Sequence, residues 1–200
     1  MRGIWAGADP GGSGAFGVAV VDESGATRCA TVSSVSEAAT WVRAQGKPHG
    51  IGIDAAMWWS AGPGGGRVAD HRLRKAYPRI HSGTVQSVNS LRGAVLAGGA
   101  LLASWMREQD PGLRITEAHP KALLLALDMD GATFAERFGI RNVWGDEEHQ
   151  RDAAIAAVRA REGFQGNWPL DLADHRERLE QNPKSYWLAS VSYWWPQQIE

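Results

Sequence analysis

Three acidic residues each come directly after a short apolar run that is typical of a β-strand. They are Asp9, Asp54 and Glu117. In an open α/β sheet, the ligand site lies beyond the carboxyl ends of the parallel strands. An acid at the end of such a strand is held by the sheet and directed into that site. We therefore expect the three carboxylates to gather at one edge of a sheet.

A fourth acid, Asp152, occupies an unusual place in the last strong helical segment. This segment opens at residues 145–152 and continues into the alanine-rich run 153–158, which lets a helix lie close to a sheet. Acids are common in a first helical turn, but a polar residue that leads a buried run is not. His149 lies three residues earlier and hence on the same face as Asp152. We expect both side chains to join the acids at the strand ends.

Together the four carboxylates, those of Asp9, Asp54, Glu117 and Asp152, indicate a metal site. Clustered carboxylates repel one another, so such a group is stable chiefly when divalent cations occupy it. Oxygen ligands without cysteine favour Mg²⁺ or Mn²⁺. Two such ions about 3.5 to 4 Å apart can activate a water molecule and stabilise the leaving oxygen in phosphodiester hydrolysis. In this interpretation Glu117 is a further ligand or an acid behind the ligands, and His149 is a ligand or a proton-transfer group.

The stretch around Asp9 also has a simpler interpretation. Residues 9–15 separate two apolar runs, of which the second is 16–21, and this indicates a β-hairpin with the acid at its mouth. Gly11 and Gly12 would let a substrate approach the backbone there. Aspartate, proline and glycine are also ordinary turn residues, however. The pairing of Asp9 with Asp54 is what favours a functional role.

One stretch of the chain concentrates positive charge. Residues 67–81 contain four arginines, one lysine and two histidines. Arginines beside acidic strand ends suit a polyanion that also meets a metal. Arg67, Arg72 and Arg74 are therefore candidate phosphate contacts of a substrate. The alternative is a helix whose charged face is simply solvated, as most charge runs are.

The composition sets bounds on the class of protein. The 200 residues suffice for a single domain, 1–200, with its own core. The formal net charge of −1 means that any nucleic-acid contact must come from a local patch. Cys29 is the only cysteine, which excludes an internal disulfide and fits a reducing, cytoplasmic compartment. Neither a signal peptide nor a run of roughly 20 apolar residues is visible, so we expect no membrane partner.

Tryptophan is frequent, with ten residues beside three tyrosines and four phenylalanines. Trp187, Trp194 and Trp195 crowd residues 164–200, which we expect to form a Trp-rich extension that packs on the domain. Tryptophan can stack on nucleic-acid bases, but core packing explains its abundance at least as well. An exposed aromatic tail would favour a homodimer.

The order of the predicted elements indicates an α/β fold. Three apolar runs separated by turns give an antiparallel meander at the start of the chain. A crossover helix then leads to a strand that ends at Asp54 and is parallel to its neighbour. We expect a mixed central sheet, antiparallel in its first three strands and parallel in its later ones, flanked by helices. The predicted helices span residues 36–45, 88–109, 121–127, 145–162 and about 170–181, and we expect a short helix with a loop within residues 128–143.

This order of elements, with acids after the strands and on a late helix, resembles the RNase H-like superfamily. Four stretches are also similar to a family of predicted RNase H-like nucleases, domain of unknown function 429. They are residues 53–56, 67–74, 117–121 and 152–157. The resemblance covers the chain from Gly3 to the end of the helix that carries Asp152. It implies an RNase H-like fold and a metal-dependent nuclease that acts on DNA or RNA.

Neighbouring families give alternative functions. Residues 9–11 and 149–152 are similar to RuvC-type Holliday-junction resolvases, in which a histidine or acid precedes the final aspartate by one turn. That family usually carries glutamate where this chain has Asp54. Residues 7–12 resemble the first phosphate loop of actin-like sugar kinases, but those proteins need two such domains. A protein of the same fold that binds nucleotides or nucleic acid with little catalysis is a further alternative.

Overall fold

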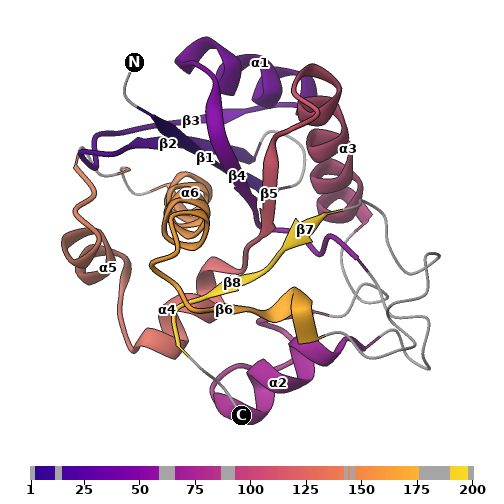
Figure 1. Ribbon diagram of the computed structural model, residues 1–200, viewed down its shortest axis with the longest axis vertical. Coiled ribbons are helices and arrows are strands. Elements are labelled where there is room, and N and C mark those ends of the chain that lie inside the picture. The colour runs from indigo at the N-terminus through magenta and orange to yellow at the C-terminus, as the bar shows by residue number, and fades with distance from the viewer. Residues whose placement is uncertain are drawn as a thin grey trace.

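A six-stranded mixed sheet forms the centre of the computed structural model, and helices cover both of its faces (Figure 1). The strand order is β3-β2-β1-β4-β5-β7, and β6 and β8 form a separate two-stranded sheet. The structure describes residues 3–11, 15–58, 66–86, 93–141, 144, 147–175 and 190–197.

The first three strands form the predicted antiparallel meander. β1 (Ile4–Pro10) pairs with β2 (Phe16–Asp22), and β2 pairs with β3 (Thr27–Val32). β4 (Pro48–Ile53) is parallel to β1, and β5 (Arg114–Glu117) is parallel to β4. This arrangement confirms the predicted α/β class. It also makes β1 and β4 neighbours, so their carboxyl ends lie at the same edge of the sheet.

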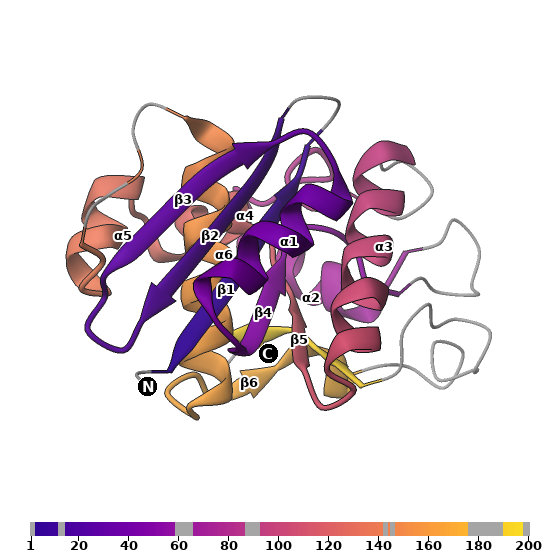
Figure 2. The same ribbon diagram turned by 90° about the horizontal axis from the view of Figure 1, so that it is seen from above.

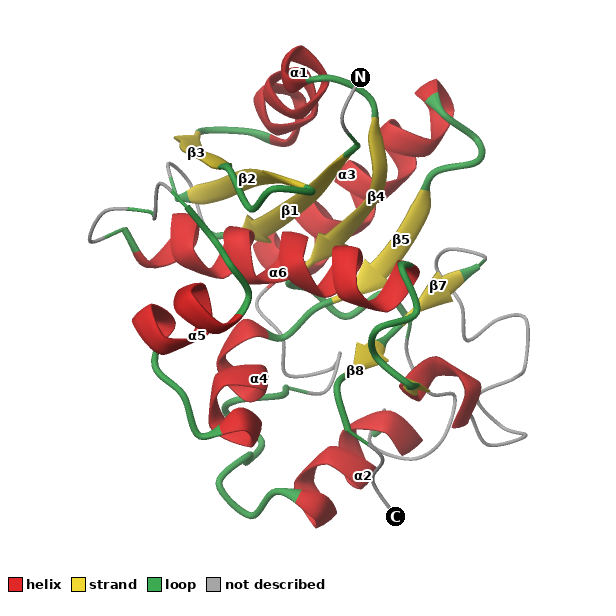
Figure 3. Cartoon of the chain, turned by 60° about the vertical axis from the view of Figure 1, so that its left-hand side comes forward, coloured by secondary structure: helices red, strands yellow, loops and turns green. Residues whose placement is uncertain are grey.

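Helices on opposite faces bury the sheet. α1 (Val35–Gln45) and α3 (Gly93–Gln109) cover one face, and α6 (Glu148–Phe164) crosses the other (Figures 2 and 3). α1 begins at Ser34, whose hydroxyl accepts a hydrogen bond from the backbone N–H of Glu37 at 3.2 Å. Such a cap satisfies a donor that the first helical turn would otherwise leave unpaired.

The contact between α6 and the sheet depends on two glycines. A Cβ atom added to Gly7 in β1 would lie 1.9 Å from the carbonyl oxygen of Ala153. One added to Gly52 in β4 would lie 2.0 Å from the carbonyl oxygen of Ala156. The backbone of α6 therefore lies directly on the backbone of the two central strands, which no residue larger than glycine would permit.

Two further helices lie on the side of the molecule to which β4 and β5 run (Figure 3). They are α2 (Val68–Ala76) and α4 (Pro120–Leu127). α4 begins with Pro120, because proline is well tolerated in the first turn of a helix. α5 (Gly131–Arg137) follows and is capped by Asp130, which accepts from the N–H of Thr133 at 2.8 Å. Among the described residues, no helix is both long and apolar enough to cross a membrane.

The described end of the chain is built into the fold. β7 (Val191–Ser192) extends the central sheet beyond β5, and β8 (Trp194–Trp195) pairs with β6 (Leu170–Asp171). Tyr193 and Trp195 are fully buried. This part of the expected extension thus packs on the domain and contributes a strand to its sheet, whereas Trp187 lies outside the described residues.

The predicted helix around residues 170–181 is wrong over the part that the structure describes. Residues 170–175 instead form β6 and a short 3₁₀ turn, η3 (Leu172–His175). The Asp171 carboxylate accepts hydrogen bonds from the backbone N–H groups of Ala173, at 3.0 Å, and Tyr193, at 2.6 Å. The bond to Tyr193 fixes the segment to residues near the end of the chain. A local sequence pattern that is typical of a helix carries no information about such a distant partner.

Candidate metal centre

Three aspartates converge where β1 and β4 end. Asp9, Asp54 and Asp152 each offer one carboxylate oxygen, and these oxygens all lie within 4.8 Å of one another. Asp54 directly follows β4 and prolongs the pairing with β1, because its N–H donates to the carbonyl of Ala8 at 2.9 Å. Asp152 lies near the start of α6, which the close contact at Gly7 holds over β1. The structure thus brings together three of the four predicted acids.

Burial makes these carboxylates hard to ionise together. It raises the pKa of Asp9 to about 6, with a further rise from the charge of Asp152 and an opposing effect of His149. The pKa of Asp54 lies well above its usual range because of burial and then because of the charges of Asp9 and Asp152. Burial also raises the pKa of Asp152, against the opposing charge of Arg151. A divalent cation would relieve this repulsion, and the all-oxygen donor set fits Mg²⁺ or Mn²⁺.

His149 belongs to this site, as the helical spacing predicts. Its Nδ1 lies 2.6 Å from Oδ2 of Asp9, and its side chain is 36 % exposed. The first turn of α6 comes close to β2 here, because a Cβ atom on Gly17 would lie 2.0 Å from the carbonyl oxygen of His149. Since Nδ1 faces Asp9, Nε2 is the ring nitrogen left to exchange a proton or to bind a ligand.

Two cations lie at the rim of the acidic cluster. Nζ of Lys121 is 2.8 Å from Glu148, and Arg151 contacts both Glu148, at 3.4 Å, and Asp152, at 2.8 Å. The charge of Lys121 lowers the pKa of Asp9, Asp54 and Asp152 alike, although burial and mutual repulsion outweigh it. The sequence analysis missed Lys121. One feature of the sequence could have identified this lysine: it lies in the first turn of the predicted helix that follows the strand ending at Glu117.

Glu117 does not join the three aspartates, which corrects its prediction as a metal ligand. Its carboxylate is fully buried, and each oxygen has two donors. Oε1 accepts from Arg67 at 2.7 Å and lies 2.8 Å from His119, while Oε2 accepts from Arg67 and from the N–H of Met57, both at 2.8 Å. Burial alone would raise the pKa of Glu117, but Arg67 and His119 outweigh it and lower the pKa to about 2. With its lone pairs used in this way, Glu117 supports the site from behind.

Arg67 also differs from its prediction as a phosphate contact. Its side chain is 0 % exposed and pairs with both Asp70 and Glu117. A further N–H donates to the carbonyl of Trp58 at 3.1 Å, and the guanidinium carbon lies 4.3 Å from the centre of the Trp58 ring. A guanidinium enclosed in this way cannot reach a phosphate on the surface.

The remaining substrate-binding predictions involve α2 and the turn after β1. Arg72 and Arg74 are half-buried on α2, and Arg74 donates to the carbonyl of Val85 at 3.2 Å. Gly11 follows β1 directly, and a Cβ atom there would lie 2.0 Å from the carbonyl oxygen of Ala15 and 3.0 Å from Cε1 of His149. Gly11 therefore lies beside the metal centre, and Gly12 lies outside the described residues. Phosphate contacts by Arg72 and Arg74 stay predictions.

Comparison with known proteins gives one family. Neither the curated proteins nor the solved structures contain a match to this chain. The family model described as "Protein of unknown function (DUF429)" matches residues 7–182, a range that includes all three aspartates and His149. The chain therefore belongs to the DUF429 family.

Proposed function

We propose that this protein is a divalent-metal-dependent nuclease with an RNase H-like fold. The observation that supports it best is the cluster of three carboxylates from Asp9, Asp54 and Asp152, whose oxygens lie within 4.8 Å of one another. Asp9 and Asp152 are buried, and Asp54 is half-buried. Like charges so close together are stable chiefly around a cation. The sheet order and the resemblance to predicted RNase H-like nucleases agree with this chemistry.

In this proposal the described residues have different roles in phosphodiester hydrolysis. Asp9, Asp54 and Asp152 would hold Mg²⁺ or Mn²⁺, which activates water and stabilises the leaving oxygen when bound. His149, fixed through Nδ1 by Asp9, would accept or deliver a proton at Nε2. Lys121 offsets the negative charge of the site and would help an anionic substrate to approach.

A RuvC-like junction resolvase is a narrower version of the same proposal. The bond between His149 and Asp9 favours it, since a histidine one turn before the last aspartate is the resembling feature. Asp54 weighs against it, because a glutamate is usual at this position in resolvases. We therefore propose phosphodiester hydrolysis of DNA or RNA and make the structure of the nucleic acid a question for the assay.

The test measures Mn²⁺ binding by calorimetry for the wild type, Asp9→Asn and Asp128→Asn. Asp128 is a matched control, because its side chain is 83 % exposed and asparagine tolerates its left-handed backbone, with φ of 52°. We expect Asp9→Asn to lose binding and Asp128→Asn to retain it. The same samples are then assayed for cleavage of labelled duplex, single-stranded and junction DNA and of RNA.

The outcomes separate binding from catalysis. Metal-dependent cleavage that is lost with Asp9→Asn supports a nuclease and identifies its substrate. Metal binding without cleavage of any substrate in the panel would favour a nucleic-acid-binding protein of the same fold. A wild type that binds no Mn²⁺, even with oligonucleotide present, would contradict the metal centre.

A further inference from the structure

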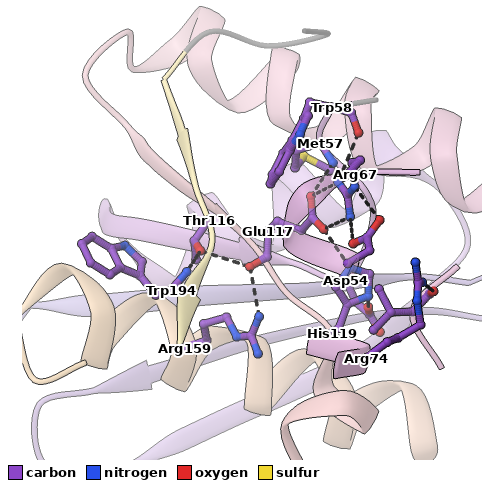
Figure 4. Close-up of polar contacts among 12 residues, drawn as sticks. Asp54, Met57, Trp58, Arg67, Arg74, Thr116, Glu117, His119, Arg159 and Trp194 are labelled. Atoms are coloured by element: carbon purple, nitrogen blue, oxygen red, sulfur yellow. Dashed lines mark hydrogen bonds and ion pairs between the residues drawn. The ribbon is translucent and has the colours of Figure 1, made fainter. Parts of the chain in front are cut away.

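A second charged cluster lies behind the metal centre and is completely buried (Figure 4). The guanidinium of Arg67 donates to both oxygens of Asp70, at 2.7 and 2.9 Å, and to both oxygens of Glu117, at 2.7 and 2.8 Å. All three side chains are 0 % exposed. The cluster joins the start of α2 to the end of β5, two segments far apart in the chain.

The stability of the fold alone does not explain why these charged side chains are buried. Buried ion pairs often contribute no more to stability than apolar residues of similar volume, because removing each charge from water is costly. Here one guanidinium serves two carboxylates, so the charges do not cancel within the trio. Glu117 completes its hydrogen bonding with the N–H of Met57 and with His119.

His119 connects the buried cluster to the metal centre. Its Nε2 lies 2.8 Å from Oε1 of Glu117, and this nitrogen carries the hydrogen because an ionised carboxylate only accepts. The other ring nitrogen, Nδ1, faces Asp54 at 3.6 Å from Oδ1. In Figure 4 the ring lies between the two carboxylates.

The surroundings of His119 leave its ring little freedom. The residue is 6 % exposed, and its ring centre lies 5.6 Å from that of Tyr193. Pro120 follows it and disfavours helical backbone angles at His119, whose φ is −141° and ψ is 83°. The backbone, the Glu117 bond and the aromatic neighbour thus fix the imidazole from three directions.

We propose that His119 is a positioning residue for Asp54, itself fixed by Glu117, Arg67 and Asp70. Without a fixed neighbour, the Asp54 carboxylate would rotate away from the like charges of Asp9 and Asp152. The imidazole edge limits this rotation and holds the carboxylate ready for a cation. This role rests on the proposed metal centre and assigns a function to the buried cluster as a whole.

Two amide substitutions of His119 distinguish the role of Nε2, which faces Glu117, from that of Nδ1, which faces Asp54. In His119→Gln the amide nitrogen takes the place of Nε2 and keeps the bond to Glu117, but nothing replaces Nδ1. In His119→Asn the amide group takes the place of Nδ1 and keeps a polar group beside Asp54, but the bond to Glu117 is lost. His49→Gln is the control, since His49 lies near the start of β4, at the opposite end from Asp54.

We expect His119→Gln to weaken Mn²⁺ binding by on the order of 10- to 100-fold, as loss of a residue that orients a metal ligand commonly does. We expect a smaller loss for His119→Asn and none for His49→Gln. The electron paramagnetic resonance spectrum of bound Mn²⁺ should also broaden in His119→Gln. A merely structural role would lower the unfolding temperature without changing this spectrum in the folded protein.

The results distinguish this proposal from the one on which it rests. If the wild type binds Mn²⁺ and His119→Gln binds it with the same affinity and spectrum, the positioning role is overturned and the metal centre stands. If the wild type binds no Mn²⁺, both proposals fall.

A measurement on the wild type covers the case in which the His119 variants do not fold. Nuclear magnetic resonance of the ¹⁵N-labelled histidine rings is recorded as Mg²⁺ is added. The ring nitrogens of His119 should shift as the site saturates, while those of His49 stay in place. Saturation without any shift at His119 would overturn the positioning role.

Discussion

At the scale of single residues, the buried carboxylate of Asp9 should make the proposed metal centre sensitive to pH. Its pKa is raised to about 6, so below that value a cation must displace a proton before it binds. We predict that the affinity for Mn²⁺ rises as the pH increases through this value, since burial also raises the pKa of Asp54 and of Asp152 and a cation must displace their protons as well. Calorimetry across roughly pH 5 to 8, in buffers with different ionisation enthalpies, would count the protons released. An affinity that does not change over this range would contradict the raised pKa.

The same carboxylate should destabilise the metal-free protein. Its pKa rises from 3.8 in a model compound to about 6 in the fold, so between these values the folded state binds more protons than the unfolded state. Stability from this group is therefore lost as pH rises through that window. We predict that Asp9→Asn stabilises the metal-free protein by about 1 to 3 kcal/mol above pH 6 and has little such effect near pH 4. Thermal unfolding in a chelator at about pH 4 and above pH 6 checks this, and an effect of Asp9→Asn that is equal at both values would contradict the raised pKa.

The sequence predicts the three aspartates of this site correctly, but it does not predict the roles of Glu117 and Arg67. The places of Asp9, Asp54 and Asp152 could be predicted from the sequence. Two of them follow strands and the third is a polar residue on an alanine-rich helix, and both patterns constrain where the side chains lie. Glu117 occupies an equivalent strand end, but its role depends on Arg67, which reaches it from another part of the chain. Neither periodicity nor spacing reports such a partner. For the same reason the sequence predicts a phosphate contact for Arg67, whose side chain is fully buried.

At the scale of elements, the contact of α6 with β1 sets the distance between Asp152 and Asp9. Gly7→Ala would place a Cβ atom 1.9 Å from the carbonyl oxygen of Ala153, which belongs to the backbone of α6 and cannot rotate away as a side chain could. We predict a loss of about 1 to 3 kcal/mol or more in stability. We also predict weaker Mn²⁺ binding by the molecules that remain folded, because α6 must move away from the strand.

Chemical unfolding and calorimetry of Gly7→Ala test these two effects. Gly93→Ala is the matched control, since a Cβ atom at Gly93 meets no atom of the described chain within 4 Å and alanine favours the helix. Equal stability of Gly7→Ala and Gly93→Ala would contradict the direct backbone contact.

At the scale of the whole molecule, the end of the chain closes the structure behind the metal centre. The Tyr193 ring is fully buried, and its centre lies 5.6 Å from that of the His119 ring and 6.1 Å from that of the Trp58 ring. We predict that Tyr193→Ala lowers the free energy of unfolding by about 3 to 5 kcal/mol, through the cavity that it leaves. Tyr193→Phe keeps the ring and should cost much less. Equal unfolding midpoints for Tyr193→Ala and the wild type would contradict a core position for this residue.

The sequence predicted the centre of the fold better than its end. Alternating apolar runs and tight turns specify the meander locally, and a crossover helix specifies a parallel strand. β7 and β8 have only two residues each, and they exist because of their partners Ile115 and Leu170. Short strands of this kind carry too little pattern of their own to be recognised before the sheet that they join.

The three aspartates of the proposed metal centre lie in β1, directly after β4 and near the start of α6. During synthesis, the ribosome must therefore release almost the whole domain before a cation finds more than two of the carboxylates together. Until then we expect the incomplete chain to bind the ion no more tightly than a flexible acidic peptide does. A bound ion thus marks a completed molecule, and it should slow amide hydrogen exchange in β1, β4 and α6 together, since losing any one of them would release it.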